Sequence, residues 1–211
     1  MDTTEQPRPA PQNRPSRWIG PAIIGASAAT GLVLLFAFST LDRHTGRPLT
    51  VHPRDRAVLV SGEFLQEVTG WRAVRTDYER YEKIRFRGQR TELRYTYDDG
   101  SGIVIKSGVV ITADKESAAQ VYASGIAALT QWALAFENGV RVEDRDEWMQ
   151  WGDHSKCTIA TRGNRIIGVR FVAVMAHRLF EFHMEGLPIP NLDFLRDRFD
   201  SRFDALENYV P

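Results

Sequence analysis

The sequence predicts an α+β protein with one N-terminal transmembrane helix followed by a single domain, in which helices pack on an antiparallel sheet. Three observations predict this class. Residues 18–41 carry no charged side chain, short segments of alternating polarity are separated by turn-forming residues, and two later segments have an apolar stripe at helical spacing. The predicted parts are a disordered Pro-rich tail at 1–17, a transmembrane helix at 18–41, a linker at 42–56 and a soluble α+β domain at 57–211.

The uncharged segment 18–41 is long enough to cross a bilayer, because a spanning helix needs about 20 apolar residues. Trp18 lies at its start, where the membrane interface favours amphipathic rings. A cleaved signal peptide is the main alternative, since Ala37-Phe38-Ser39 fits a small-x-small cleavage site. The apolar stretch exceeds the usual signal-peptide core of about 7–15 residues, so we expect an uncleaved anchor.

Small residues recur four positions apart on the predicted transmembrane helix, a spacing that lets a second helix approach closely. The expected helix-packing residues are Ala22, Gly25, Ser27, Ala29 and Gly31. Three arginines precede the span and four follow it closely, so this count does not set the orientation. A short tail with Arg17 beside the span is typical of a signal anchor. We therefore expect a single-pass protein of the bacterial inner (cytoplasmic) membrane with a periplasmic domain.

The charge balance limits the possible partners of the chain, and the single cysteine limits its disulfide chemistry. The chain has 27 basic and 27 acidic residues and no net charge, which argues against nucleic acid as a partner. Cys157 is the one cysteine, so it cannot form an internal disulfide and does not reveal the redox compartment.

Three strands are predicted in the first half of the domain, at residues 81–86, 91–97 and 103–111. The middle strand alternates, so we expect one buried face and one solvent face. The expected buried residues are Leu93, Tyr95 and Tyr97, and the expected solvent-facing residues are Glu92, Arg94 and Thr96. Ahead of these strands, residues 57–69 predict a short helix ended by Gly70, with a strand at 58–60 as the alternative.

A long helix follows, because Asp114 can cap a helix that runs to Phe136 and ends at Asn138-Gly139. Its expected apolar stripe consists of Ala118, Val121, Tyr122, Gly125, Ile126, Leu129, Trp132 and Phe136. Residues 141–147 predict a charged connection, and residues 148–151 are expected to begin a second portion of the sheet.

The last third of the chain predicts hairpins and a final helix. Gly163-Asn164 indicates a turn between strands at 156–161 and 165–175, and Ala176-His177 can turn the chain into a strand at 179–184. Asn191 can cap the final helix. The expected apolar stripe of that helix consists of Leu192, Leu195, Phe199, Phe203 and Leu206.

The resulting element order, from about residue 78 to 208, is three strands, a helix, three or four strands and a helix. This order resembles the PsbP/Mog1-like α/β/α sandwich in outline. The resemblance implies roles found in that class, which includes accessory proteins of membrane complexes and lipid- or ligand-binding modules. A fold alone does not determine function.

Asp153, His154 and Cys157 form the densest polar cluster, but we expect no catalytic, cofactor-binding or metal-binding residue. His154 and Cys157 give only two ligands, whereas a zinc site needs three or four. A nucleophilic Cys157 would need a nearby base and a lowered pKa. His183 shares a strand face with Glu181 and Glu185, which allows a proton-linked role, but solvated strand residues are the expectation.

Residues 71–94 contain eight basic residues interleaved with aromatic ones, a composition typical of the centre of a protein–protein interface. Anionic lipid headgroups could meet the same side chains. The alternative is a solvated face with internal ion pairs of small energy. The interface candidates are Trp71, Arg72, Arg75, Tyr78, Arg80, Tyr81, Arg85, Arg87 and Arg90.

Taken together, these features predict a non-enzymatic, single-span accessory or scaffold subunit of a larger membrane protein complex, for example a respiratory or photosynthetic assembly. The helix would dock in the bilayer and the domain would cover the extracytoplasmic face. The alternative is a membrane-tethered sensor or a module that binds a small ligand or lipid, which predicts a pocket between sheet and helix. An enzyme of another type would require convergent polar groups with shifted pKa values.

Overall fold

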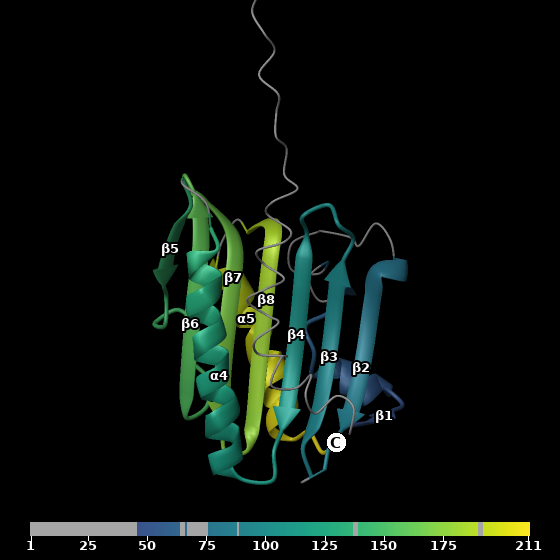
Figure 1. The fold of residues 1–211 in the computed structure, drawn as a ribbon. Coiled ribbons are helices and arrows are strands. Elements are labelled where there is room, and N and C mark those ends of the chain that lie inside the picture. The colour runs from purple at the N-terminus through teal and green to yellow at the C-terminus, as the bar shows by residue number, and fades with distance from the viewer. Residues whose placement is uncertain (1–45, 64–65, 67–75, 88, 137–138, 190–191) are drawn as a thin grey trace, which may run out of the picture.

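One antiparallel sheet of eight strands organises the domain, in the order β1-β2-β3-β4-β8-β7-β6-β5 (Figure 1). The computed structural model describes residues 46–211 except 64–65, 67–75, 88, 137–138 and 190–191. The strands are β1 (Arg47–Leu49), β2 (Glu79–Arg85), β3 (Thr91–Asp98), β4 (Val104–Ile111), β5 (Arg141–Asp144), β6 (His154–Arg162), β7 (Arg165–Met175) and β8 (Arg178–Ile189). The helical elements are α2 (Pro53–Ala57), the 3₁₀ turn η2 (Thr76–Tyr78), α4 (Lys115–Leu134) and α5 (Leu192–Glu207).

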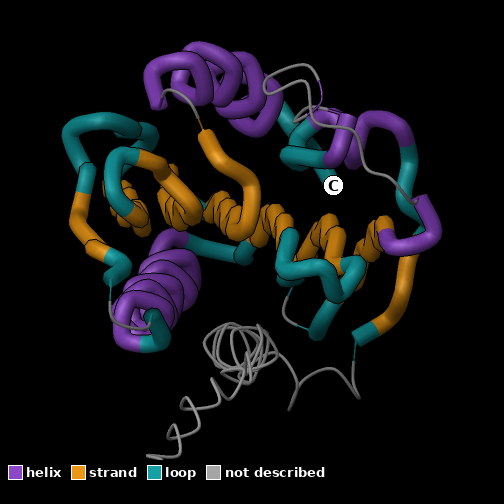
Figure 2. The backbone as a smooth tube through the Cα atoms, turned by 90° about the horizontal axis from the view of Figure 1, so that it is seen from above, coloured by secondary structure: helices purple, strands orange, loops and turns teal. Residues whose placement is uncertain are grey.

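Helices cover both faces of the sheet, so the domain has three layers (Figure 2). Helix α4 packs on strands β6, β7 and β8 from one side. Helix α5 lies on the opposite side. Short helix α2 belongs to the α5 side, because its Asp55 side chain meets Tyr209 just after α5.

The larger core lies between the sheet and α5, where period-two positions of the strands meet the helical stripe. Phe180 and Phe182 of β8 pack against Phe199, with ring centroids 5.9 Å and 5.1 Å apart. Trp151 stacks on Phe203 at 4.9 Å. The predicted stripe of this helix is confirmed, since its buried residues include Leu195, Phe199, Phe203 and Leu206.

The α4 side has a smaller apolar contact, made by Val110, Leu129, Val172 and Leu179. Gly125 lets the helix approach β7 closely, because a Cβ there would lie only 2.9 Å from Val172 Cγ2. The predicted cap is confirmed, since the Asp114 carboxylate accepts a 2.7 Å hydrogen bond from the Ser117 N–H.

The strand and hairpin predictions are confirmed within a few residues, but the predictions for two other segments are wrong. Residues 141–147 are not only a connection, because Arg141–Asp144 forms the edge strand β5, where charged side chains are common. Residues 148–151 form a loop rather than a strand, with Trp148, Met149 and Trp151 buried. The solvent face predicted for β3 is also wrong, since Glu92 and Arg94 are buried and form an ion pair.

The domain begins earlier in the chain than predicted. Strand β1 pairs with β2, and α2 follows it, so both lie within the stretch assigned to a linker at 42–56. A Cβ at Gly46 would lie 2.6 Å from Ile84 Cγ2, so the backbone already packs on β2 at this residue. The helix expected over 57–69 starts later than predicted: α2 ends at Ala57, and the buried residues 58–60 form neither helix nor strand. The described residues Gly62, Glu63 and Gln66 are helical.

The predicted tail, the predicted transmembrane helix and its helix-packing residues (Ala22, Gly25, Ser27, Ala29 and Gly31) lie outside the described residues. Among the helices that are described, none combines the length and the apolar character needed to cross a membrane.

Candidate functional site: an ionisable pocket and a basic edge

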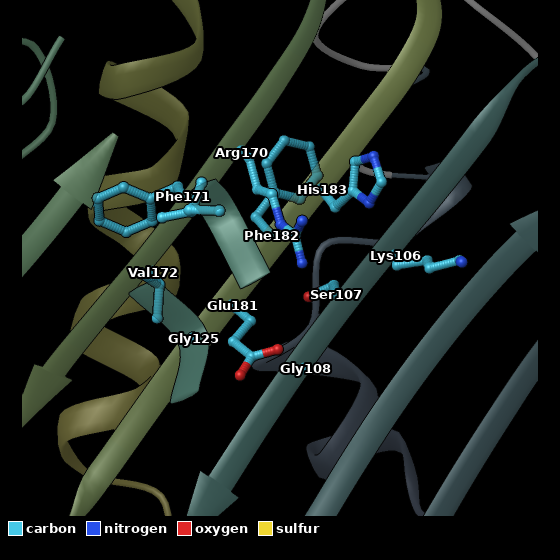
Figure 3. Close-up of a pocket in the computed structure, with 11 residues that line it drawn as sticks. Lys106, Ser107, Gly108, Gly125, Arg170, Phe171, Val172, Glu181, Phe182 and His183 are labelled. Atoms are coloured by element: carbon cyan, nitrogen blue, oxygen red, sulfur yellow. The ribbon is translucent and has the colours of Figure 1, made fainter. Parts of the chain in front are cut away.

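A pocket lies between the middle of α4 and the sheet, and charged side chains line it (Figure 3). Its lining includes Lys106, Gly108, Gly125, Arg170, Glu181 and His183. These residues come from β4, β7, β8 and α4, and we call the site the α4 pocket. Its cavity volume is about 20 Å³, close to the space that one water molecule occupies.

The strand register brings these side chains to one face of the sheet. His183 of β8 lies directly between Lys106 of β4 and Arg170 of β7. Two residues along β8, Glu181 lies opposite Gly108. Because side chains on one face repeat every two residues, the missing side chain of Gly108 leaves the hollow that Glu181 borders.

His183 is held by Glu185, which lies two residues further along the same face. The carboxylate of Glu185 accepts hydrogen bonds from the indole N–H of Trp132 and, at 2.8 Å, from His183 Nε2. Burial lowers the pKa of His183 to about 4, so the ring is neutral at pH 7. Since Nε2 carries the proton, His183 Nδ1 is an acceptor, and this buried atom has no partner in the described part of the chain.

Glu181 is an acid of the pocket whose pKa is strongly shifted. Burial raises the pKa of its carboxyl group to about 7, against the opposing effect of the Arg170 charge. No hydrogen bond or ion pair joins this carboxylate to any described residue. A carboxyl group with a pKa near neutral pH exchanges a proton readily under physiological conditions.

One cation, Arg170, faces this acid, whereas the Lys106 ammonium points away from Glu181 (Figure 3). Arg170 is buried and donates a 2.8 Å hydrogen bond from Nη1 to the carbonyl of Ala128 in α4, and burial lowers its pKa to about 10. Burial also lowers the pKa of Lys106, which is half-buried. Figure 3 shows the Arg170 guanidinium pointing between His183 and Glu181. The pocket therefore combines the N–H donors of Arg170 with a titrating acid, and the unpartnered Nδ1 of His183 is buried beside it.

The polar cluster singled out in the sequence does not form a site. His154 and Cys157 lie an odd number of residues apart on β6 and so point to opposite faces. His154 is exposed, whereas Cys157 lies in the main core. Asp153 accepts a hydrogen bond from the Ala176 N–H and so shapes the turn before β8. In the described ranges, no group of three or more His, Cys, Asp or Glu side chains is placed to hold a metal ion.

Cys157 should resist thiol reagents while the domain is folded. Burial strongly raises the pKa of its thiol, and the thiolate is the reactive form. We expect a maleimide to modify the native chain at least about 100-fold more slowly than the chain unfolded in guanidinium chloride. Mass spectrometry of timed samples checks this. Equal rates in both states would show that β6 is accessible in the native domain.

The interface candidates are dispersed by the fold. Trp71, Arg72 and Arg75 lie outside the described residues. Tyr78 and Tyr81 pack against the core, and Arg90 pairs with Glu92 while its guanidinium lies over Phe86. Arg80, Arg85 and Arg87 are exposed, with Arg80 and Arg85 on opposite faces of β2.

Exposed arginines gather instead at the β1 end of the sheet. We call Arg47, Arg54, Arg56, Arg85 and Arg87 the basic edge; all are exposed. Arg47 lies directly opposite Arg85 across the β1–β2 pair, an arrangement that like charges disfavour. Arg56 lies 4.6 Å from the Tyr81 ring centroid. No ion pair joins any of the five to another described residue. The sequence reasoning missed three of them because they fall in the predicted linker.

A buried cluster of polar side chains connects the basic edge to the C-terminal end of the chain. The Asp55 carboxylate is fully buried and lies 3.1 Å from Lys83 Nζ. It also accepts hydrogen bonds from the Tyr209 hydroxyl and, at 2.8 Å, from the His52 N–H. Burial alone would raise the pKa of Asp55, but these partners hold it below its ordinary value. We call Asp55, Lys83 and Tyr209 the Asp55 cluster.

Comparisons of the chain with protein-family models, with curated proteins and with solved structures found no match. The resemblance to the PsbP/Mog1-like sandwich stays a prediction based on element order.

Proposed function

We propose that this chain is a non-enzymatic, single-span accessory subunit of a larger membrane protein complex, with its domain held against the extracytoplasmic face of the bilayer. The observation that carries the proposal is the early start of the domain. The predicted span ends at Leu41 and packing on the sheet begins at Gly46. Five Cα–Cα steps reach at most roughly 18 Å, so the domain has little freedom to leave the membrane surface.

The basic edge supports the same placement. It lies where the chain enters the domain, so a domain on so short a connection presents this edge to the lipid headgroups. Basic residues near an anionic membrane surface gain about 1 kcal/mol each. Anionic headgroups between Arg47 and Arg85 would offset the repulsion between these opposed side chains.

A second candidate, a membrane-tethered sensor or small-ligand module, is favoured by the α4 pocket. A metabolite of drug size needs a pocket of about 300 Å³ or more, and the cavity of about 20 Å³ is far smaller. Only an ion or a small functional group fits, so the pocket favours regulation by such a species over metabolite capture.

Native separation of mildly solubilised membranes tests the accessory role. The full chain should migrate in a high-mass band, and a variant with leucine at Gly25 and Ala29 should leave that band, because bulky residues block close helix approach. Leucine at Val33 and Phe36 serves as the matched control. Migration of the wild-type chain alone in gentle detergent would contradict the proposal.

The contact with lipid gives a separate prediction. In nanodiscs, the peptide that spans residues 47–57 should exchange amide hydrogens more slowly with anionic than with zwitterionic lipid. Glutamine at Arg47 and Arg85 should abolish this difference. Arg162 and Arg165 form an equivalent exposed cross-strand pair at the β6–β7 turn. Glutamine at these two positions is the control and should leave the difference between the lipids unchanged. Identical exchange in both lipids would show that the basic edge does not meet headgroups.

A further inference from the structure

The two edges of the sheet differ in how well they resist pairing with another strand. β1 and β5 are the outermost strands, so each has one side without a neighbouring strand in the described part of the chain (Figure 1). The β1 edge is protected, because that strand has three residues and one of them, Pro48, has no N–H to donate. We call Arg141–Asp144 the β5 edge; it contains no proline and keeps all its N–H donors.

The outward backbone groups of the β5 edge belong to Val142 and Asp144. Just after this strand, the N–H of Arg145 donates a 2.8 Å hydrogen bond to the carbonyl of Cys157 on β6. Backbone groups alternate in direction along an antiparallel strand, so those of Val142 and Asp144, one and three residues earlier, point away from β6. These N–H and C=O groups form a template for a further antiparallel strand.

The side chains of the β5 edge complement a second copy of the same strand in one register. Arg141 and Glu143 lie on one face, where they form a 2.7 Å ion pair, and the Arg141 side chain is 79% exposed. Antiparallel pairing that places Val142 opposite Val142 of a second copy also places Arg141 opposite Glu143 of that copy, and the two-fold symmetry repeats this pair. The four charges then alternate in sign, which stabilises cross-strand neighbours.

The neighbouring registers are disfavoured by charge. A shift of two residues keeps each side chain on its own face, but it places Arg141 opposite Arg141 of the second copy or Glu143 opposite Glu143. Like charges directly opposite each other destabilise a strand pair. A shift of one residue would put side chains from opposite faces across from each other, which the pleat does not allow. The β5 edge therefore selects a single register.

We propose that two copies of this chain pair through their β5 edges, with Val142 at the two-fold axis, and form one continuous antiparallel sheet. The interface is isologous, because both copies contribute the same strand. Its axis is perpendicular to the sheet, so two copies in one bilayer lie with the sheet along the membrane surface and a basic edge at each end. This placement rests on the proposed membrane helix, whereas the strand pairing itself does not.

The short interface makes the dimer weak in dilute solution. Pairing of four residues per copy buries less than the roughly 1,200 Å² at which stable complexes begin. Confinement of both chains to one membrane raises their effective concentration and favours the pair. A covalent trap in the membrane is therefore a more sensitive test than separation by size.

Disulfide trapping of the full chain in liposomes tests the proposal. In the Val142→Cys variant the two Cα atoms lie about 5.5 Å apart, within the range that a disulfide bridges. Asp144→Cys is the matched control, because its Cα atoms lie about 14 Å apart in this register. Cys157 is buried and should not compete. We expect at least about fivefold more covalent dimer from Val142→Cys on a non-reducing gel. An equal or higher yield from Asp144→Cys would overturn the pairing.

A charge exchange in the Val142→Cys background gives a second readout. Arg141→Glu alone should lower the dimer yield about tenfold, because it opposes carboxylates across the interface. Adding Glu143→Arg should restore the yield, because opposite charges face each other again. Arg165→Glu, on the exposed β6–β7 turn, is the control and should change nothing. An unchanged yield in the single variant, or no recovery in the double variant, would overturn the pairing.

These outcomes are separable from those of the accessory role. A chain that remains in the high-mass native band but forms no trapped dimer would contradict the strand pairing alone. A chain that traps as a dimer but otherwise migrates without a larger complex would contradict the accessory role alone.

Discussion

Replacement of Asp55 by alanine should lower the free energy of unfolding by about 3–5 kcal/mol, the usual cost of breaking one side of a buried ion pair. The change leaves the buried ammonium of Lys83, which is 5% exposed, without its counter-charge. It also removes the acceptor of the Tyr209 hydroxyl. Thermal and urea unfolding of the full chain in detergent measure the effect.

A double variant separates the charge effect from lost packing. Leucine at Asp55 with methionine at Lys83 replaces both charges with apolar groups, so it should recover most of the loss. Glu207→Ala, an exposed acid at the end of α5, should change stability by under about 0.5 kcal/mol. A loss below about 1 kcal/mol for Asp55→Ala would show that the Asp55 cluster does not fasten the domain.

Glu181→Gln should stabilise the domain at pH 8 by roughly 1 to 3 kcal/mol and leave it almost unchanged near pH 4. The folded-state pKa of Glu181, about 7, exceeds its ordinary value of 4.5. A raised carboxyl pKa means that the folded state disfavours ionisation. The penalty is absent below about pH 4.5, grows as the pH rises, and is complete above pH 7. A neutral glutamine never carries this penalty.

Unfolding curves of both chains between pH 4 and pH 8 measure this difference, and the melting temperature should rise by roughly 3 to 10 °C at pH 8. The titration of His183 gives stability the opposite pH dependence, because the pKa of this ring is lowered to about 4. It reduces stability as the pH falls from about 6.5 towards 4, in wild type and variant alike. An equal effect of Glu181→Gln at both pH values would show that burial does not shift this carboxyl group.

Local sequence patterns predicted most elements of the fold, because helix caps, turns and the apolar stripes of helices depend on residues that are close together in the sequence. Asp114 caps its helix as expected, and the turn at Gly163-Asn164 joins β6 to β7. The short edge strands β1 and β5 were missed. Three or four residues give too few alternations to show a period of two.

The candidate sites depend on contacts between distant residues, and local patterns do not carry that information. The shared face of Glu181, His183 and Glu185 was visible in the sequence, but its cover by α4 was not, so the residues were expected to be solvated. Asp55 meets Tyr209 across 154 positions of the chain. In the sequence, Asp55 lies between two arginines and looks like a solvated residue of a helical turn. Only the fold shows that its side chain is buried.

Energy transfer from the domain to headgroup-labelled lipid tests the central claim, that a membrane helix holds this domain close to the bilayer. A dye on cysteine at Arg47 of the full chain in nanodiscs should lie within about 20 Å of the headgroup plane. Cys157 is buried and should not compete for the label. The same dye on cysteine at Asn164, next to the far edge of the sheet, gives a second distance within the domain. A chain that fails to enter the nanodisc, or an Arg47 label more than about 40 Å from the lipid, would contradict the claim.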